Sequence, residues 1–234
     1  EEPAGENRAD GAFIDYRINA PVAGPVVLAI LDANGATVRR FSSSDHPKAT
    51  SPDAVPFPAF WIRMAPRVDA SPGMHRFAWD FQYATMAGEP SSFALEGGPL
   101  APPGRYTVRL SAGGKSWSQA FAVRKDPRVS ASDADLVAQF RVAREIEALR
   151  VTTQTSYAMA LKRRKLAVAG GPQAQSPDNS VGSPATEFTT LWAVAGALES
   201  LQAEVESADT APTADELTAL AHWRAVLAAD RARL

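Results

Sequence analysis

Hydrophobic residues follow two different periods along the chain, and the change of period divides it. Up to Arg124, short runs alternate between apolar and polar positions, which is typical of half-buried strands. From Ser130 onward, apolar residues recur every three or four positions, which is typical of amphipathic helices. The change falls at "KDPRVS", residues 125–130, where the proline cannot continue a strand ladder. The pattern predicts an α+β chain of two domains, with strands in residues 1–125 and helices in residues 126–234.

The first part predicts an antiparallel β-sandwich, because each predicted strand offers one apolar face to a shared core. Burial of a large side chain stabilises a fold by roughly 1.5–3 kcal/mol, so the alternating aromatic residues favour a core over a ligand platform. The predicted strands cover residues 12–18, 25–32, 37–41, 75–83, 104–112 and 116–123, and the predicted core positions include Phe77, Trp79, Phe81, Tyr106, Val108 and Leu110.

Two glycine-containing stretches resemble functional loops but predict turns. Asp32-Ala33-Asn34-Gly35 could begin a calcium loop, yet no further oxygen ligands follow at alternating positions. Asn34-Gly35 instead predicts a two-residue type I′ hairpin, which needs positive φ at both positions. Gly113-Gly114 predicts a second hairpin and lacks the spacing of a phosphate-binding loop.

The second part predicts three helices packed as an antiparallel bundle. The first begins with Ser130 or Ser132 as N-cap and runs to about Ala167, with the basic run of residues 162–165 near its end. Ser183-Pro184 predicts the start of the second helix, and Thr213 with Glu216 forms a capping-box pattern before the third. The predicted apolar stripes are Leu136, Phe140, Ala143, Ile146 and Leu149, then Phe188, Leu191, Trp192, Ala195, Leu198 and Leu201, then Leu217, Leu220, Trp223, Leu227 and Leu234.

Two long segments between strands, residues 42–74 and 84–103, are rich in Ser, Pro and Gly. Loops of this length within a compact domain are usually functional or mobile. The first contains the aromatic residues Phe57, Phe60 and Trp61, which we expect to cover the edge of the sandwich. Docking of these aromatic residues onto a neighbouring domain is the alternative.

Composition and charge exclude several classes of function. The formal net charge of −2 over 234 residues gives no field that would attract nucleic acid or an anionic membrane. No apolar run reaches the ~18–20 residues that span a bilayer. The absence of cysteine excludes disulfides, thiolate metal sites and cysteine nucleophiles. We therefore expect no nucleic-acid partner and no membrane insertion.

The side chains that could carry chemistry do not form a recognisable motif. The three histidines, at 46, 75 and 222, lack metal-ligand spacing, and no Gly-x-Ser-x-Gly nucleophile elbow occurs. A pair of carboxylates close in space could still act as in glycoside hydrolases, and Asp15, Asp80 and Glu96 are the candidates. The sequence predicts no catalytic, cofactor-binding or metal-binding residue.

The stretches "VVLAILDANGATVRRF", "GMHRFAWDFQY" and "PPGRYTVRLSAGGKSWSQAFAV" together resemble the immunoglobulin-like domain of the flagellar hook-capping type. With "GENRADGAFIDYRI" before them and "KDPRVSASDADLVAQF" and "ESADTAPTADELTAL" after them, nearly the whole chain resembles one larger family. This is the C-terminal region of exported bacterial proteins with a sortilin-like, BNR-repeat β-propeller, often described as glycosyl hydrolases.

The resemblance implies a propeller N-terminal to Glu1, an extracytoplasmic location and no established catalytic residue in this portion. We therefore expect a non-catalytic accessory module that supports the propeller or binds protein or glycan. The first alternative is an enzyme of the glycoside-hydrolase class with a carboxylate pair in the sandwich. The second is an assembly domain that docks through the aromatic residues at 57–61.

Overall fold

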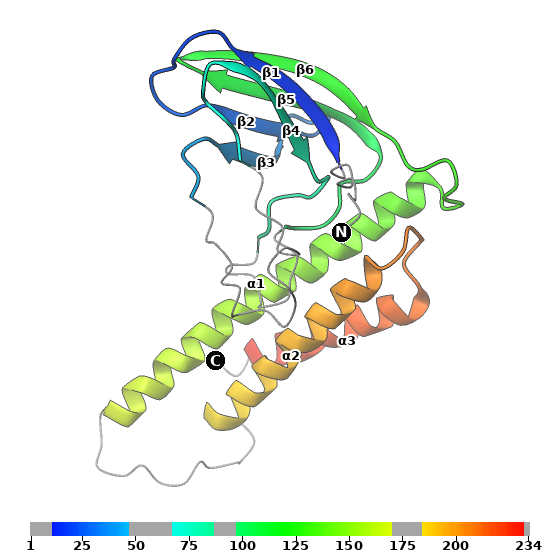
Figure 1. Ribbon diagram of the computed structural model, residues 1–234. Helices are drawn as coiled ribbons and strands as arrows, with labels where there is room; N and C mark the ends of the chain where they lie inside the picture. The colour runs from blue at the N-terminus through cyan, green and yellow to red at the C-terminus, as the bar shows by residue number, and fades with distance from the viewer. Residues whose placement is uncertain (1–10, 47–66, 87–96, 170–183, 232–234) are drawn as a thin grey trace, which may run out of the picture. The chain divides into compact units, whose positions relative to one another are not determined.

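The protein is α+β, and its described residues form three helices and two antiparallel sheets (Figure 1). The computed structural model describes residues 11–46, 67–86, 97–169 and 184–231. Contacts within the chain divide it into two compact units, Glu1–Ala84 with Gly104–Arg124, and Thr85–Pro103 with Lys125–Leu234. The first unit holds the strands and the second holds the helices.

All six predicted strands are present in the first unit, and every pairing between them is antiparallel. One sheet has two strands, β1 and β4, and the other has four in the order β3-β2-β5-β6. Strand β6 therefore lies at an edge of the larger sheet. The strands are β1 (Ala12–Ile18), β2 (Val27–Leu31), β3 (Thr37–Ser42), β4 (Gly73–Trp79), β5 (Gly104–Ala112) and β6 (Lys115–Val123).

Strand β4 ends at Trp79, four residues before its predicted end. Phe81 has a φ of 61°, which an extended strand does not allow. The carboxylate of Asp80 accepts the backbone N–H of Gln82 and so supports this turn. The prediction that Phe81 continues the strand alternation is therefore wrong, although its ring still contacts that of Trp79 at 5.5 Å between centroids.

Trp79, at the end of β4, is a core residue of the first unit that contacts the larger sheet. The Trp79 side chain is fully buried, and its ring contacts Tyr106 on β5 at 5.6 Å and Phe121 on β6 at 6.1 Å. Its indole N–H donates to the Gln82 carbonyl, so burial leaves no unpaired donor. Phe77 is also buried, as predicted, whereas the other two predicted core residues of β5, Val108 and Leu110, are only half-buried.

The two predicted turns are both present, but only one has the predicted geometry. Gly113 and Gly114 have φ of 54° and 75° between the paired residues Ala112 and Lys115, as a type I′ turn requires. At Asn34-Gly35, only Gly35 has positive φ, so the type I′ prediction is wrong there. The Gly35 N–H donates to the Asp32 carbonyl, and the Asp32 carboxylate accepts the N–H groups of Asn34 and Ala36. This oxygen is therefore engaged in building the turn.

The three predicted helices are α1 (Asp133–Ala169), α2 (Pro184–Val205) and α3 (Ala214–Arg231). Ser132 is the N-cap of α1, since its hydroxyl accepts the backbone N–H of Asp135. In return, the Asp135 carboxylate accepts the backbone N–H of Ser132. Thr213 and Glu216 form the predicted capping box in front of α3. The basic run of residues 162–165 lies before the last turn of α1, which contains no basic residue. The run therefore lies too far from the end of α1 to complement the helix dipole there.

The helices of the second unit pack in antiparallel order along the chain (Figure 1). Gln139, near the start of α1, donates to the Val205 carbonyl at the end of α2, while Ala160 and Leu191 share a cluster at the opposite ends. Most predicted core positions are buried, including Ala143, Ile146, Leu191, Leu198, Leu201, Leu220 and Leu227.

Two predicted core residues of the helices are instead exposed. Trp192 is 69% exposed and Leu217 is 47% exposed. On α2, Val194 belongs to the hydrophobic cluster between the helices although it is not among the predicted positions. Trp192 directly follows the buried Leu191, and Leu217 lies one turn before the buried Leu220, so the buried stripe is narrower and shorter than predicted. Over their described residues, none of the helices is long and apolar enough to cross a membrane.

We expect Trp79→Ala to lower the free energy of unfolding by about 3–5 kcal/mol, because it removes the central ring of the first unit and leaves a cavity. Met74→Ala on the same strand is the control, since Met74 is 68% exposed and should change stability by less than about 0.5 kcal/mol. Urea unfolding followed by circular dichroism measures both. Equal stability of the two variants would contradict the central role of Trp79.

Candidate functional site

The two described candidate carboxylates lie apart and are each paired with an arginine. Asp15 lies opposite Arg76 in the β1–β4 ladder, and the guanidinium donates to both carboxylate oxygens at 2.8 Å. Hydrogen bonding from Arg76 lowers the pKa of Asp15, although the small desolvation of the carboxylate opposes it. A general acid of a glycosidase needs the opposite shift, because it must hold its proton near neutral pH.

Asp80 follows the last residue of β4 and belongs to the turn there. Both of its oxygens lie 3.1 Å from the Arg39 guanidinium. Since Asp15 is opposite Arg76, Asp80 is displaced from it by four residues along the strand, or about 13 Å. The structure does not bring the two carboxylates together, and Glu96 lies outside the described residues.

The three histidines occupy three unrelated environments. His75 Nε2 lies 2.7 Å from the Ser71 carbonyl and its ring contacts Tyr16, which accounts for its place on β4. His222 contacts the neighbouring Trp223 ring, and His46 is exposed after β3. Within the described ranges, no three His, Cys, Asp or Glu residues lie close enough together to hold a metal ion.

An open groove lies in the first unit beside the turn that joins β5 to β6. Its volume is about 570 Å³, which is within the ~300–1,000 Å³ range of small-ligand sites. One wall is the chain from Arg17 through the β1–β2 connection to Ala23, and the other is the β5–β6 hairpin. The hairpin turn approaches closely, because a Cβ on Gly113 would lie 3.4 Å from the Val22 side chain.

The described residues that line the groove include one aromatic side chain, two cations and several apolar side chains. Trp117 is 55% exposed and lines the groove, while Ile18 and Leu110 supply buried and half-buried apolar surface next to it. Arg17 and Lys115 also line it, and the described lining residues include no Asp or Glu. The groove therefore combines apolar surface with positive charge, which suits a ligand that has an apolar face and a negative group.

Sequence analysis missed Trp117 because it lies on the same face of β6 as Phe121, which reaches the core. Alternate positions on a strand share a face, so periodicity alone assigns both rings to the interior. The one signal that separates them is the context. Trp117 is flanked by Ser116 and Ser118 and followed on its own face by Gln119, so the strand lacks a continuous apolar face there.

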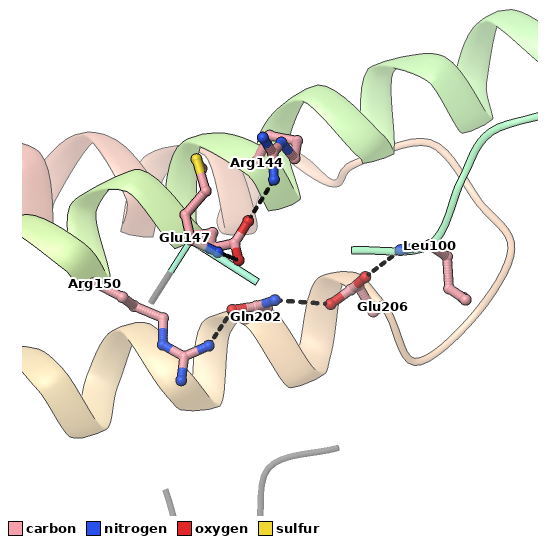
Figure 2. Close-up of polar contacts among 7 residues, drawn as sticks. Leu100, Arg144, Glu147, Arg150, Gln202 and Glu206 are labelled. Atoms are coloured by element: carbon pink, nitrogen blue, oxygen red, sulfur yellow. Dashed lines mark hydrogen bonds and ion pairs between the residues drawn. The ribbon is translucent and has the colours of Figure 1, made fainter. Parts of the chain in front are cut away.

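The second unit contains a cluster of polar side chains that bind the backbone of Met86 and Leu100 to the helices (Figure 2). Glu147 on α1 is only 1% exposed, and its two oxygens accept the Met86 N–H at 2.5 Å and the Arg144 guanidinium at 2.8 Å. Glu206, just after α2, accepts the Leu100 N–H at 3.1 Å.

The same cluster extends across α2 to α1. Glu206 also accepts the Gln202 amide, whose oxygen accepts the Arg150 guanidinium at 2.6 Å (Figure 2). Both oxygens of Glu147 and of Glu206 are thus occupied by donors of the chain itself. The cluster fixes the fold of this unit and offers no free carboxylate for chemistry.

Comparison with known protein families, with curated protein sequences and with solved structures found no match for this chain. The aromatic residues Phe57, Phe60 and Trp61, expected to cover an edge or to dock, lie outside the described residues.

We expect the carboxyl group of Asp15 to titrate below its usual pKa of about 3.9 and to be ionised throughout the neutral range. Since the folded pKa is lowered, the ion pair with Arg76 supports folding above the unfolded pKa and is lost as the pH falls through the folded pKa. Carboxyl-detected NMR titration measures it. Arg76→Gln should raise the value toward normal, Arg105→Gln should not, and titration near pH 6 would indicate a proton donor instead.

We expect Glu147→Met to destabilise the second unit by about 2–4 kcal/mol, because it leaves the Met86 N–H and the Arg144 guanidinium without this acceptor. Glu147→Gln retains an acceptor oxygen and should cost less. Glu204→Met, at an exposed position on α2, is the matched control and should be near neutral. Thermal unfolding measures all three, and equal effects of the Met variants would contradict the assigned role of Glu147.

Proposed function

We propose that this chain is a non-catalytic binding module that holds a protein or glycan ligand in the groove beside Trp117. The observation that carries this proposal is the exposed indole of Trp117 in a groove that Arg17, Lys115 and apolar side chains also line. Isolated exposed apolar residues are common on protein surfaces, but this one lies in a concavity of ligand size with two cations. An indole also contributes a large contact area at little cost in conformational entropy.

The groove supports binding more than bond cleavage. No carboxylate is among the described residues that line it, so these residues supply no acid–base pair, and Asp15 and Asp80 are engaged by arginines elsewhere. The glycoside-hydrolase alternative would require two carboxyl groups about 5–10 Å apart facing a common cleft. No observation on the described residues favours it.

The proposal includes a finer architecture and a context. The first unit is an immunoglobulin-like sandwich and the second is an antiparallel three-helix bundle. Contacts between Trp79 and the larger sheet, and the antiparallel order of the helices, support this assignment. The resemblance of the sequence to the C-terminal region of exported propeller proteins supports an extracytoplasmic role beside a propeller of the parent chain.

We expect Trp117→Ala to reduce the affinity for a groove ligand by at least about tenfold, because a tryptophan that a ligand covers is a frequent hot spot of binding. Ligands are first selected with the intact chain on a glycan array and a displayed random-peptide library, and affinities are then measured by calorimetry. Trp192→Ala is the matched control, since it removes an indole that is 69% exposed on α2. Equal loss in both variants, or turnover of a bound glycan, would contradict the proposal.

A further inference from the structure

Strand β6 is a long edge strand with little protection against pairing. It lies outermost in the order β3-β2-β5-β6 and pairs with β5 in continuous register from Gly104↔Val123 to Ala112↔Lys115. From Ser116 to Val123 it has no charged residue, no proline and no register shift. The first six residues of the strand, Lys115 to Ala120, are all exposed.

Such an edge presents backbone N–H and C=O groups that no other strand of the described residues pairs with. Proteins usually block edge strands with charges, proline, bulges or a covering element, because an open edge accepts another strand. In β6, Lys115 at the start of the strand is the one charged residue. On the outward face its residues are Ser116, Ser118, Ala120 and Ala122, which are small enough to let a further strand approach.

Resting on the proposed function, we propose that the ligand is an extended segment of a partner protein that adds to β6 as a further strand. Main-chain hydrogen bonds to the edge supply affinity, and side chains at alternate positions supply specificity. An apolar partner side chain beside Trp117 covers the exposed indole. A partner carboxylate near the hairpin end pairs with Arg17 and Lys115. Both cations line the groove, and its described lining includes no acidic residue.

Charge complementarity favours a partner segment of this kind over a second copy of the chain. Two copies could pair through β6, but this strand carries no carboxylate to meet Arg17 and Lys115. A glycan could stack on Trp117, but it would leave the backbone groups of the β6 edge without partners. An extended, acid-bearing peptide satisfies the edge, the indole and the cations together.

The test uses the intact chain and a displayed library of random twelve-residue peptides. A selected peptide is synthesised with backbone N-methyl groups on either of its two alternating sets of residues, and binding is measured by calorimetry. In a strand added to an edge, one set directs its N–H groups toward β6 and the other directs them away. We expect methylation of one set to lower affinity at least tenfold and methylation of the other to change it less than threefold.

Two substitutions in the peptide and the chain test the charge and the indole. Replacing the acidic residue of the peptide by its amide should weaken binding about three- to tenfold, and Lys115→Gln should weaken it by a similar factor. The two changes combined should weaken binding no more than either one alone, because they remove the same ion pair. Trp117→Ala should weaken binding at least tenfold, whereas Trp192→Ala should not. Main-chain pairing does not depend on these side chains, so the N-methyl comparison needs no variant that might misfold.

Each other outcome overturns the inference in a recognisable way. Equal effects of the two methylated sets would exclude strand addition, while dependence on Trp117 would still support a binding groove. Selection of glycans only, or of peptides without an acidic residue, would likewise overturn this inference alone. Association of the chain with itself, detected by sedimentation and lost in Trp117→Ala, would assign the edge to a second copy. No Trp117-dependent ligand of either kind would overturn the proposed function as well.

Discussion

The first unit depends on the contact that the buried ring of Trp79 makes between two sheets of unequal width. Over the described residues the smaller sheet has two strands and the larger has four, at about 4.8 Å per strand. The ring of Trp79, at the end of β4, contacts Tyr106 on β5 and Phe121 on β6 and so links the two sheets. Trp117, nearer the hairpin at Gly113-Gly114, is 55% exposed. Among the described residues, one indole therefore joins the two sheets and the other is open to solvent beside the groove.

The polar residues of both units act mainly on the fold itself. Asp32 and Asp80 accept backbone N–H groups in turns, and Asp15 is paired with Arg76 across two strands. In the second unit, Glu147 and Glu206 accept backbone N–H groups from the segment Thr85–Pro103. A carboxylate whose oxygens accept such donors is held in one orientation and has its acceptor sites occupied, which suits structure better than proton transfer.

The groove and the β6 edge differ from these sites because their binding capacity is unused within the described chain. The groove combines two cations with no acidic residue, and the edge strand combines free backbone groups with small outward side chains. Both features meet at Trp117, which stands on the edge strand and lines the groove. Their coincidence at one residue is why we interpret them as one binding surface.

The sequence by itself determined the elements and many of their ends. Local physics suffices there: alternation defines the strands, the three-to-four-residue period defines the helices, and the Thr213–Glu216 capping box and the Gly113-Gly114 turn need only neighbouring residues. It also fixed much of the core, since Phe77, Trp79, Ile146 and Leu198 lie on the expected apolar faces. The type I′ geometry at Asn34-Gly35 failed because the Asp32 carboxylate stabilises a different turn.

The tertiary structure alone decided which apolar residues remain in contact with solvent. Trp79 and Trp117 both occupy inward positions of strands, yet one is fully buried and the other is 55% exposed. On α2, Trp192 is exposed while Leu191 is buried. Periodicity states the direction in which a side chain points but not whether another element covers it. Cover depends on the width and length of the opposing sheet or helix, and residues far apart in the sequence set both.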